Sequence, residues 1–304
     1  MPKVSVLLTC YNHLEFLGPC VDSIRGQTMG DFEVIAIDDG SSDGTREWLL
    51  SQPDLRILFN ESNLGTYASL NRGLAECAGE YVAILNDDDL WAPEKLRAQV
   101  ELMESDPSIG LCHTDGWFID GQGNRLEGSP LGFEFPRTLK GNVLTALLYA
   151  NKIIASAALV RRECFERLGG FNEEYFGSGD WEMWLRIAAA YPVGYVDLPL
   201  TFYRVHGANA SHKLERIWQD DERLRKWIRS QNASYGQMGL DGHDLRNAMA
   251  HNEACLGTVC KLNGKPAEAR RAYARSIRLS PGRWKSYVRW LATYFPAGVF
   301  RRLG

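Results

Sequence analysis

Long apolar runs, paired cysteines and an excess of basic residues are all missing from this sequence. No stretch reaches the roughly 18 apolar residues of a membrane-spanning helix, and the short apolar run Val4–Leu8 is typical of a buried strand rather than of a signal-peptide core. The seven cysteines include no C-x-x-C pair, which argues against a disulfide framework or a zinc site and favours a reducing compartment. We therefore expect a cytoplasmic protein.

The formal net charge of -4 and the pI near 5.9 lack the basic surplus of nucleic-acid-binding domains, so we expect no nucleic-acid partner. Apolar residues make up 45% of the 304 residues and charged residues 24%, which is enough apolar side chain to build a sizeable core. At about 100–200 residues per domain, this length fits one large domain and an appendage.

Strands and helices are predicted to alternate through the first third of the chain. Short apolar runs predict strands at Val4–Thr9, Phe32–Asp38, Arg56–Phe59 and Tyr81–Leu85. Helix signals predict helices at Leu14–Ile24, from near Thr45 with Asp43 as its cap, at Thr66–Cys77 and, after Pro93, at Glu94–Glu104. This rhythm predicts an α/β fold with a mostly parallel central sheet and helices on both faces.

The pattern is less regular from Ile109 onward. Extended segments are expected at Ile109–His113, Trp117–Asp120 (with a glycine-rich turn at 121–123), Ile153–Val160 and Gly194–Leu198. Helices are expected at Asn142–Tyr149 and Asp180–Ala190, and a loop at Gly128–Arg137.

The last third of the chain is predicted to be helical. Leu214–Arg229 has the pattern of a charged amphipathic helix, and Asn247–Pro281 that of a helical hairpin broken at Asn263-Gly264. One tetratricopeptide-type unit is indicated by the spacing of Leu256, Gly257, Ala269, Tyr273 and Pro281. Because one such unit cannot bury its apolar face alone, we expect it to pack on the preceding domain or on a partner.

Acidic residues follow two of the predicted strands directly. Asp87-Asp88-Asp89 is the longer cluster, and three adjacent carboxylates raise one another's pKa values unless a hard divalent cation such as Mg²⁺ or Mn²⁺ binds them. Asp38-Asp39 is the second cluster, and acidic ends of neighbouring parallel strands would converge on one cleft. A helix cap or a solvated turn is the alternative for either cluster.

The order and spacing of six segments resemble those of family 2 glycosyltransferases. The segments are VSVLLTCYN at 4–12, DDGSSDGT at 38–45, NLG at 63–65 with NRG at 71–73, GEY at 79–81 running to Asp89, GDWE at 179–182 and YRVH at 203–206. The resemblance covers residues 3–212 and implies a GT-A fold, with a donor half at about 1–110 and an acceptor half at about 111–212. Residues 213–304 would then form a C-terminal helical region with the tetratricopeptide-like hairpin at about 247–281.

The resemblance also implies which residues hold a nucleotide-sugar donor. Thr9 and Tyr11 match contacts at the base, with Tyr11 as the stacking aromatic. Asp39 matches the carboxylate that accepts a hydrogen bond from a pyrimidine ring N–H, which favours UDP- or dTDP-sugars. Gly65 matches a close backbone approach to the donor. Two further donor contacts are expected at the start of the family's D-x-D motif, where this chain has Asn86 and Asp87.

The family's chemistry maps onto four further residues. Asp88 and Asp89 match the metal-binding end of the D-x-D motif, and His206 matches a late-loop histidine that completes metal or diphosphate binding, so the implied cofactor is Mn²⁺ or Mg²⁺. Asp180 matches the catalytic base, although Gly179 stands where the family has Glu and a helix N-cap is the alternative role. One base opposite a metal-held leaving group implies inversion at the sugar's anomeric carbon.

Two other classes fit parts of the sequence. A nucleotidyltransferase would share the sheet and the metal, but it would carry a glycine-rich loop where this chain has Tyr11-Asn12-His13. A non-catalytic nucleotide-sugar-binding or scaffold protein would use the helical hairpin as its working surface. The presence of Asp88, Asp89, Asp180 and His206 argues against such a loss of catalysis.

The resemblance implies a saccharide or lipid-linked acceptor and a role in polysaccharide or lipopolysaccharide synthesis. Aromatic residues alternate with basic ones between Arg283 and Arg302. Such a tail either rests on an anionic membrane surface or packs on the domain, so a peripheral contact with the inner face of the membrane stays open at this point.

Overall fold

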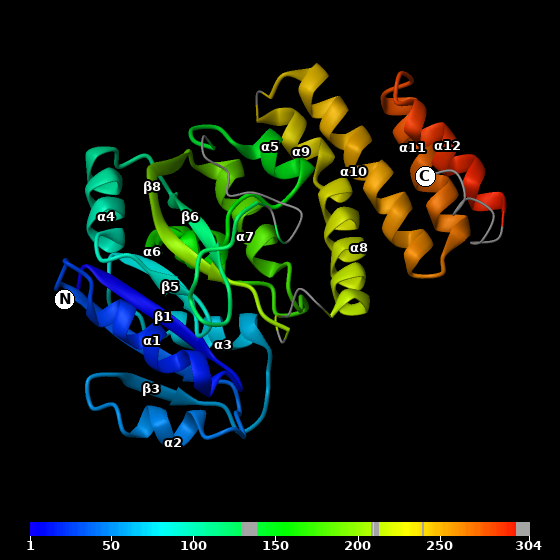
Figure 1. The fold of residues 1–304 in the computed structure, drawn as a ribbon. Helices are drawn as coiled ribbons and strands as arrows, with labels where there is room; N and C mark the ends of the chain where they lie inside the picture. Colours follow the sequence, from blue (N-terminus) through cyan, green and yellow to red (C-terminus); the bar gives the residue numbers. More distant parts are fainter. Residues whose placement is uncertain (129, 131–138, 208, 210–212, 239, 296–304) are drawn as a thin grey trace. The chain divides into compact units, whose positions relative to one another are not determined.

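The computed structural model describes residues 1–128, 130, 139–207, 209, 213–238 and 240–295. The predicted loop at Gly128–Arg137 and the end of the C-terminal tail therefore lie almost wholly outside the described residues. The chain divides into two compact units, one made of residues 1–143 and 152–209 and the other of residues 144–151 and 210–304 (Figure 1).

The first unit is built on one eight-stranded sheet with the order β3-β2-β1-β4-β7-β6-β8-β5. The strands are β1 Val4–Cys10, β2 Phe32–Asp38, β3 Arg56–Phe59, β4 Tyr81–Asn86, β5 Leu90–Trp91, β6 Leu111–Ile119, β7 Leu159–Arg161 and β8 Val193–Arg204. Strands β1 to β4 are all parallel, as is the pair β6 and β8, whereas β7 and β5 pair antiparallel with their neighbours. The predicted α/β sheet is thus confirmed, with four parallel strands in the first hundred residues and a second parallel pair, β6 and β8, after them.

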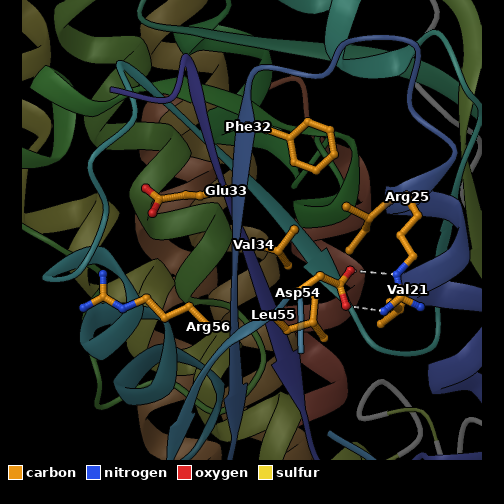
Figure 2. Close-up of a pocket in the computed structure, with 9 residues that line it drawn as sticks. Val21, Arg25, Phe32, Glu33, Val34, Asp54, Leu55 and Arg56 are labelled. Atoms are coloured by element: carbon orange, nitrogen blue, oxygen red, sulfur yellow. Dashed lines mark hydrogen bonds and ion pairs between the residues drawn. The ribbon is translucent and has the colours of Figure 1, made fainter. Parts of the chain in front are cut away.

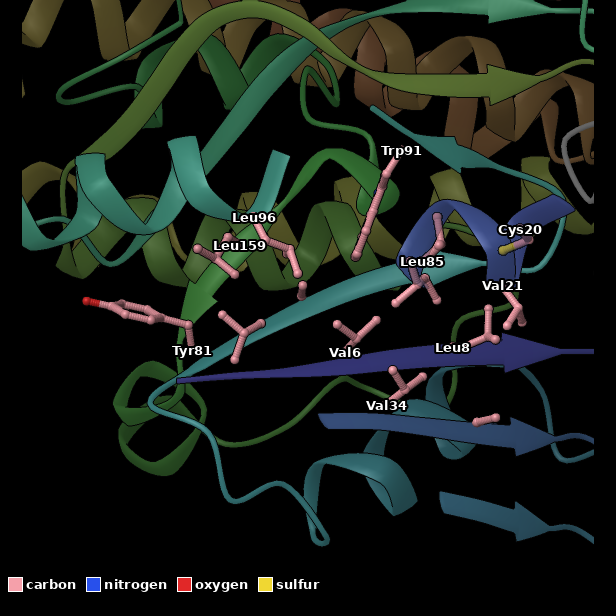
Figure 3. Close-up of a cluster of buried hydrophobic side chains, with 14 of the residues drawn as sticks. Val6, Leu8, Cys20, Val21, Val34, Tyr81, Leu85, Trp91, Leu96 and Leu159 are labelled. Carbon is pink, nitrogen blue, oxygen red and sulfur yellow. The ribbon is translucent and has the colours of Figure 1, made fainter. Parts of the chain in front are cut away.

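Helices cover both faces of this sheet because the strands are apolar on both sides. The helices of the unit are α1 Leu14–Arg25, α2 Thr45–Leu50, α3 Thr66–Leu74, α4 Lys95–Ser105, α6 Arg162–Leu168 and α7 Gly179–Ala190. Val6 and Leu8 of β1 point to the face covered by α1 and α4, and both side chains are fully buried (Figure 3). Leu7 points to the opposite face, where Gly73 of α3 packs so closely that a Cβ would lie 2.7 Å from it.

Several local predictions differ from the structure. The two strands expected at Ile109–His113 and Trp117–Asp120 are one strand, β6, whose register against β8 shifts at Thr114–Gly116. At that bulge the side chains no longer alternate between the two faces of the sheet. The polar residues there therefore resemble a loop between two strands in the sequence pattern. Gly44, not Asp43, is the N-cap of α2, although Asp43 still accepts a hydrogen bond from the Thr45 N–H.

The other differences are in element ends. Helix α3 stops at Leu74, before the predicted end at Cys77. The segment predicted to be extended at Ile153–Val160 contains the 3₁₀ turn η1 at Ala155–Ala157 before β7 begins. Strand β8 continues past the predicted Leu198 to Arg204 because it also pairs with β5.

One helix of the first unit buries a lysine. Lys95 is fully buried in α4, its Nζ donates to Gln99 Oε1 at 2.6 Å, and it lies 4.1 Å from the centroid of the Trp91 ring. Burial lowers the pKa of Lys95 to about 7. Between that value and the ordinary pKa of 10.5, the unfolded chain binds a proton that the folded protein does not, so stability rises with pH across this window.

Replacing Lys95 with methionine should therefore stabilise the protein most at and below neutral pH. The advantage should shrink as pH rises from about 7 to about 10, because wild-type Lys95 becomes neutral in its apolar site. Urea unfolding of both proteins across this pH range measures the difference. A difference that does not change with pH would show that Lys95 has an ordinary pKa.

The second unit consists of helices. They are α5 Leu144–Tyr149, α8 Leu214–Ser230, α9 Asn232–Gln237, α10 Gly242–Leu262, α11 Pro266–Leu279 and α12 Trp284–Leu291, with the 3₁₀ turn η3 at Ala292–Tyr294. Helix α5 belongs to this unit because it packs on α10, whereas the sequence analysis included Asn142–Tyr149 in the acceptor half. None of the described helices is long and apolar enough to cross a membrane.

Helices α10 and α11 form the predicted hairpin. Gly257 of α10 faces the ring of Tyr273 of α11, where a Cβ would lie 2.7 Å from the ring, and the Tyr273 hydroxyl lies 3.0 Å from Thr258 Oγ1. A second side of α10 is covered by α8, where Asn252 Nδ2 donates to the Arg225 carbonyl at 3.0 Å. The hairpin was expected to bury its apolar surface on the preceding domain or on a partner. Helix α8 of the same unit covers part of that surface.

A cavity of about 490 Å³ lies under α1 at the amino ends of β2 and β3 (Figure 2). Apolar side chains such as Val34 and Leu55 line it, and an ion pair between Arg25 and Asp54 crosses its edge at 2.6 Å. Arg56 on its lining pairs with Glu76 outside it, and none of the predicted site residues lines the cavity. The candidate site lies at the other end of the strands.

Candidate active site

The carboxyl ends of β1, β2 and β4 bring the predicted donor-binding residues to one edge of the sheet. Thr9 pairs in register with Asn86 on one side, and the next residue of β1 pairs with Asp38 on the other. Tyr11 follows β1 at this edge, where it is 40% exposed, and its N–H donates to Asp87 Oδ2 at 2.8 Å. The predicted convergence of the two acidic strand ends is therefore confirmed.

The carboxylate of Asp39 holds the loop that leads into α3. Its Oδ1 accepts hydrogen bonds from Asn60 Nδ2 at 2.7 Å and the Leu64 N–H at 2.8 Å, and its Oδ2 accepts one from the Gly65 N–H at 2.9 Å. Gly65 has a φ of +93° and open space around its Cβ position. The left-handed φ favours glycine at this position, and the close approach to the donor that the resemblance implies stays a prediction.

The three adjacent aspartates after β4 point to three different sets of partners. Asp87 accepts from the Tyr11 N–H and lies 2.8 Å from His13 Nδ1. Asp88 Oδ2 lies 3.0 Å from His206 Nε2 and accepts from Asn209 Nδ2 at 3.2 Å. Asp89 has a third set, because one oxygen accepts from the Ser156 hydroxyl and the other from the Arg204 N–H.

Burial and mutual repulsion make this acidic turn electrostatically costly. Burial is the main cause that raises the pKa of Asp89 well above its usual value, and the charge of Asp88 raises it further. Burial also raises the pKa of Asp87, where the hydrogen bond with His13 acts in the opposite direction. Burial lowers the pKa of His13, but its hydrogen bond and charge interaction with Asp87 outweigh that effect and raise the pKa overall. A cation at this turn would relieve the repulsion.

His13, Asp88 and His206 form a group that can hold a metal ion. Each offers one ligand atom, and the three atoms lie within 4.8 Å of one another. Two imidazole nitrogens and one carboxylate oxygen suit Mn²⁺ and later first-row metals, and a nucleotide diphosphate could add oxygen ligands. Asp89 is not in this group, and its fully buried carboxylate faces Ser156 and Arg204 inside the protein.

His13 is the site residue that the sequence analysis missed. His13 follows β1, and Asp88 follows the neighbouring parallel strand β4 at the same edge of the sheet. This position after a parallel strand is the feature of the sequence from which His13 could have been predicted. Its Nδ1 is held by Asp87, and a carboxylate on one ring nitrogen is the usual way to orient a metal-binding histidine through the other. Asp87 is thereby placed as the residue that orients His13.

The segment after β8 is fastened to the acidic turn. Arg204 is buried, its Nε donates to the Asp88 carbonyl at 2.7 Å, and its Nη1 donates to the carbonyls of Asp120 and Gly121. Asn209 Oδ1 accepts from the His206 N–H at 2.6 Å, and its Nδ2 reaches Asp88. The described segment that carries the predicted late-loop histidine is therefore tied to the acidic turn.

Asp180 is the second residue of α7, whose N-cap is Ser178, so the predicted alternative of Asp180 as an N-cap is wrong. Its Oδ1 accepts from the Trp181 N–H at 2.7 Å and lies 3.4 Å from the Tyr67 hydroxyl. A Cβ on Gly179 would lie 2.8 Å from the Tyr67 ring, which explains why no larger residue stands there. Trp181 is 7% exposed and packs in the interior.

Known proteins resemble this chain in sequence over more than half of its length. Residues 5–169 match the family model described as glycosyl transferase family 2. An uncharacterised glycosyltransferase of Methanocaldococcus jannaschii is 32% identical over 224 residues, a match covering 71% of this chain and 74% of the relative. The chondroitin synthase of Escherichia coli is 27% identical over 245 residues, which cover 79% of this chain but 34% of that enzyme.

Solved structures share the fold. S. aureus TarS residues 1–349 in complex with UDP-GlcNAc superposes with a TM-score of 0.69 at 15% identity, covering 96% of this chain and 89% of that chain. The mannosyltransferase PcManGT from Pyrobaculum calidifontis, in complex with GDP-Man and Mn²⁺, gives a TM-score of 0.57 at 23% identity and covers 96% and 86%. The GT-A fold expected from the sequence is confirmed, and the extent of the family match shows that the chain belongs to glycosyl transferase family 2.

Proposed function

We propose that this chain is an inverting, metal-dependent glycosyltransferase that moves a sugar from a UDP- or dTDP-sugar to a hydroxyl group of a saccharide or lipid-linked acceptor. One observation carries the proposal: the His13, Asp88 and His206 group lies at the same sheet edge as Tyr11 and Asp39. A donor bound there would meet a base-binding surface and a cation site together. A role in polysaccharide or lipopolysaccharide synthesis agrees with the chondroitin synthase likeness.

Each residue has a distinct part in the proposed reaction. A Mn²⁺ or Mg²⁺ ion on His13, Asp88 and His206 would offset the charge that builds on the departing diphosphate. Asp180 takes the proton from the acceptor hydroxyl as the new glycosidic bond forms, and direct displacement then inverts the anomeric configuration. Thr9, Asn86 and Asp87 line the donor side in this assignment, with Asp87 also holding His13 in place.

Tyr11 and Asp39 support a pyrimidine base. The Tyr11 ring is exposed enough to stack on a base, and Asp39 Oδ2 accepts a single protein hydrogen bond, from the Gly65 N–H. A carboxylate oxygen has two lone pairs, so the second can accept from the ring N–H of uracil or thymine, a proton that cytosine lacks. The two solved relatives carry UDP-GlcNAc and GDP-Man, so fold likeness alone does not choose the base.

UDP and dTDP should therefore bind in Mn²⁺ at least about tenfold more tightly than CDP, because cytosine lacks the ring N–H and one charge-assisted hydrogen bond is worth roughly 1.5–3 kcal/mol. They should also bind more tightly than GDP if the pocket fits a pyrimidine. Calorimetry with the four diphosphates measures this order. Tyr11→Ala should weaken all four, whereas the exposed Leu50→Ala change on α2 should weaken none. CDP binding as tightly as UDP would contradict the assignment of Asp39, and GDP binding as tightly as UDP would contradict the preference for a pyrimidine.

We place the reaction in the cytoplasm, with a peripheral contact to the inner face of the membrane through the C-terminal tail. A screen of UDP-, dTDP-, GDP- and CDP-sugars for donor-dependent release of nucleoside diphosphate tests the central proposal. Release that requires both a divalent metal and intact Asp88 would support it. Tight donor binding with no release, with or without acceptors, would favour the non-catalytic alternative instead.

A further inference from the structure

The basic residues of this acidic chain are concentrated at its C-terminal end. Nine Lys or Arg residues and no Asp or Glu occur after Glu268, so residues 269–304 carry a formal charge of +9. The preceding 268 residues hold the other 25 basic residues and all 38 acidic ones, a formal charge of -13. A block of one sign on a chain of the other sign is typical of a segment that meets an oppositely charged surface.

Helix α12 lies in this basic block, and its outer face exposes apolar side chains. Ser286 is buried with its Oγ 3.0 Å from Ser276 Oγ, and Trp290, one turn later, packs against the core of the hairpin. The outer face consists of Trp284, Tyr287, Val288 and Leu291, which are 66%, 41%, 47% and 52% exposed. These four follow i, i+3, i+4, i+7 spacing, so the face that a soluble helix fills with polar residues is an apolar stripe here.

Two cations lie along one side of this stripe. Lys285 and Arg289, four residues apart on α12, are both exposed. Neither forms an ion pair with an acidic side chain in the part of the chain that the structure describes. The Lys285 Nζ lies 5.8 Å from the centroid of the Trp284 ring. Long basic side chains of this kind can lay their stems along apolar surface and carry their charge to a polar layer above it.

We propose that α12 is an interfacial helix that lies in the surface of a bilayer containing anionic phospholipid. Its outer stripe would enter the boundary between headgroups and acyl chains, with Lys285 and Arg289 against lipid phosphates. A bilayer of this kind complements both features at once, the apolar stripe and the uniform positive charge of the segment. The inference extends the peripheral membrane contact within the proposed function and uses none of the residues of the sugar-transfer site.

Vesicle sedimentation of the full chain tests this inference. Wild-type protein should bind vesicles of phosphatidylcholine with phosphatidylglycerol, and bind pure phosphatidylcholine much less. Trp284→Ser with Leu291→Ser should weaken partitioning at least about tenfold, because both apolar side chains leave the bilayer. Lys285→Gln with Arg289→Gln should cost about fivefold per charge at low salt and remove most of the lipid preference.

A matched control lies in the same helical unit. Leu262 at the end of α10 is 49% exposed, a fraction similar to that of Leu291, but it lies outside the basic block. Leu262→Ser should therefore leave vesicle binding unchanged. All variants should keep the wild-type Tm and UDP affinity, which separates this test from that of the proposed function. Failure of wild type to bind anionic vesicles would overturn the inference. So would equal vesicle binding by the Trp284/Leu291 variant. A wild-type protein that forms a dimer through this stripe and binds no lipid would overturn it as well.

Discussion

Asp180→Asn should lower turnover by about 10²–10⁴-fold, the range typical of removing a general base, while UDP affinity stays within about twofold. Asparagine keeps an oxygen that can accept from the Trp181 N–H and the Tyr67 hydroxyl, so the start of α7 should not change. What is lost is the ability to take a proton. Turnover is measured as nucleoside diphosphate released from the donor, and donor affinity by calorimetry.

Two controls keep this result interpretable. Glu174→Gln removes an exposed carboxylate from the same segment of chain and should leave turnover unchanged. Tyr67→Phe removes one hydrogen bond to Asp180 and should have a smaller effect than Asp180→Asn. Near-normal turnover by Asp180→Asn would show that the residue serves only the helix start. A product with retained anomeric configuration would contradict direct displacement, whichever residue is the base.

Asp88→Asn should remove the Mn²⁺ dependence of UDP binding and leave only the weak affinity seen without metal. Loss of an orienting partner of a metal ligand typically costs about 10–100-fold in metal affinity, so loss of the only carboxylate of the group should cost more. Calorimetry of UDP binding with Mn²⁺ and with EDTA measures the effect. Asp106→Asn, at an exposed carboxylate on the turn after α4, is the matched control.

The same measurement separates the three candidate ligands. His13→Gln and His206→Gln should each weaken the metal-dependent part of UDP binding, whereas Asp89→Asn should act mainly on stability, because Asp89 bonds to Ser156 and Arg204 inside the protein. Mn²⁺ binding followed by electron paramagnetic resonance gives a readout without donor or turnover. If Asp88→Asn and His13→Gln both bind Mn²⁺ as wild type does, the metal site lies elsewhere.

The fold and most of the donor edge could be predicted from the order of residues along the chain. Short apolar strands alternating with amphipathic helices impose a parallel sheet, and such a sheet brings the residues that follow β1, β2 and β4 to one edge. The strand pattern alone placed Asp39 and Asp88 at this edge, and the resemblance to the family added Tyr11. The motifs kept their order along the chain, which is why the family could be identified from them.

The part that each carboxylate plays depends instead on tertiary contacts. Asp87, Asp88 and Asp89 are adjacent in sequence, but each side chain leaves the turn in a different direction and meets different elements. Asp89 was predicted as a metal ligand and bonds instead to η1 and β8, while His13 was passed over and lies beside Asp88. These roles depend on partner residues from strands and loops far along the chain. Tertiary packing sets the distances between the aspartates and those partners, and a local sequence pattern does not predict it.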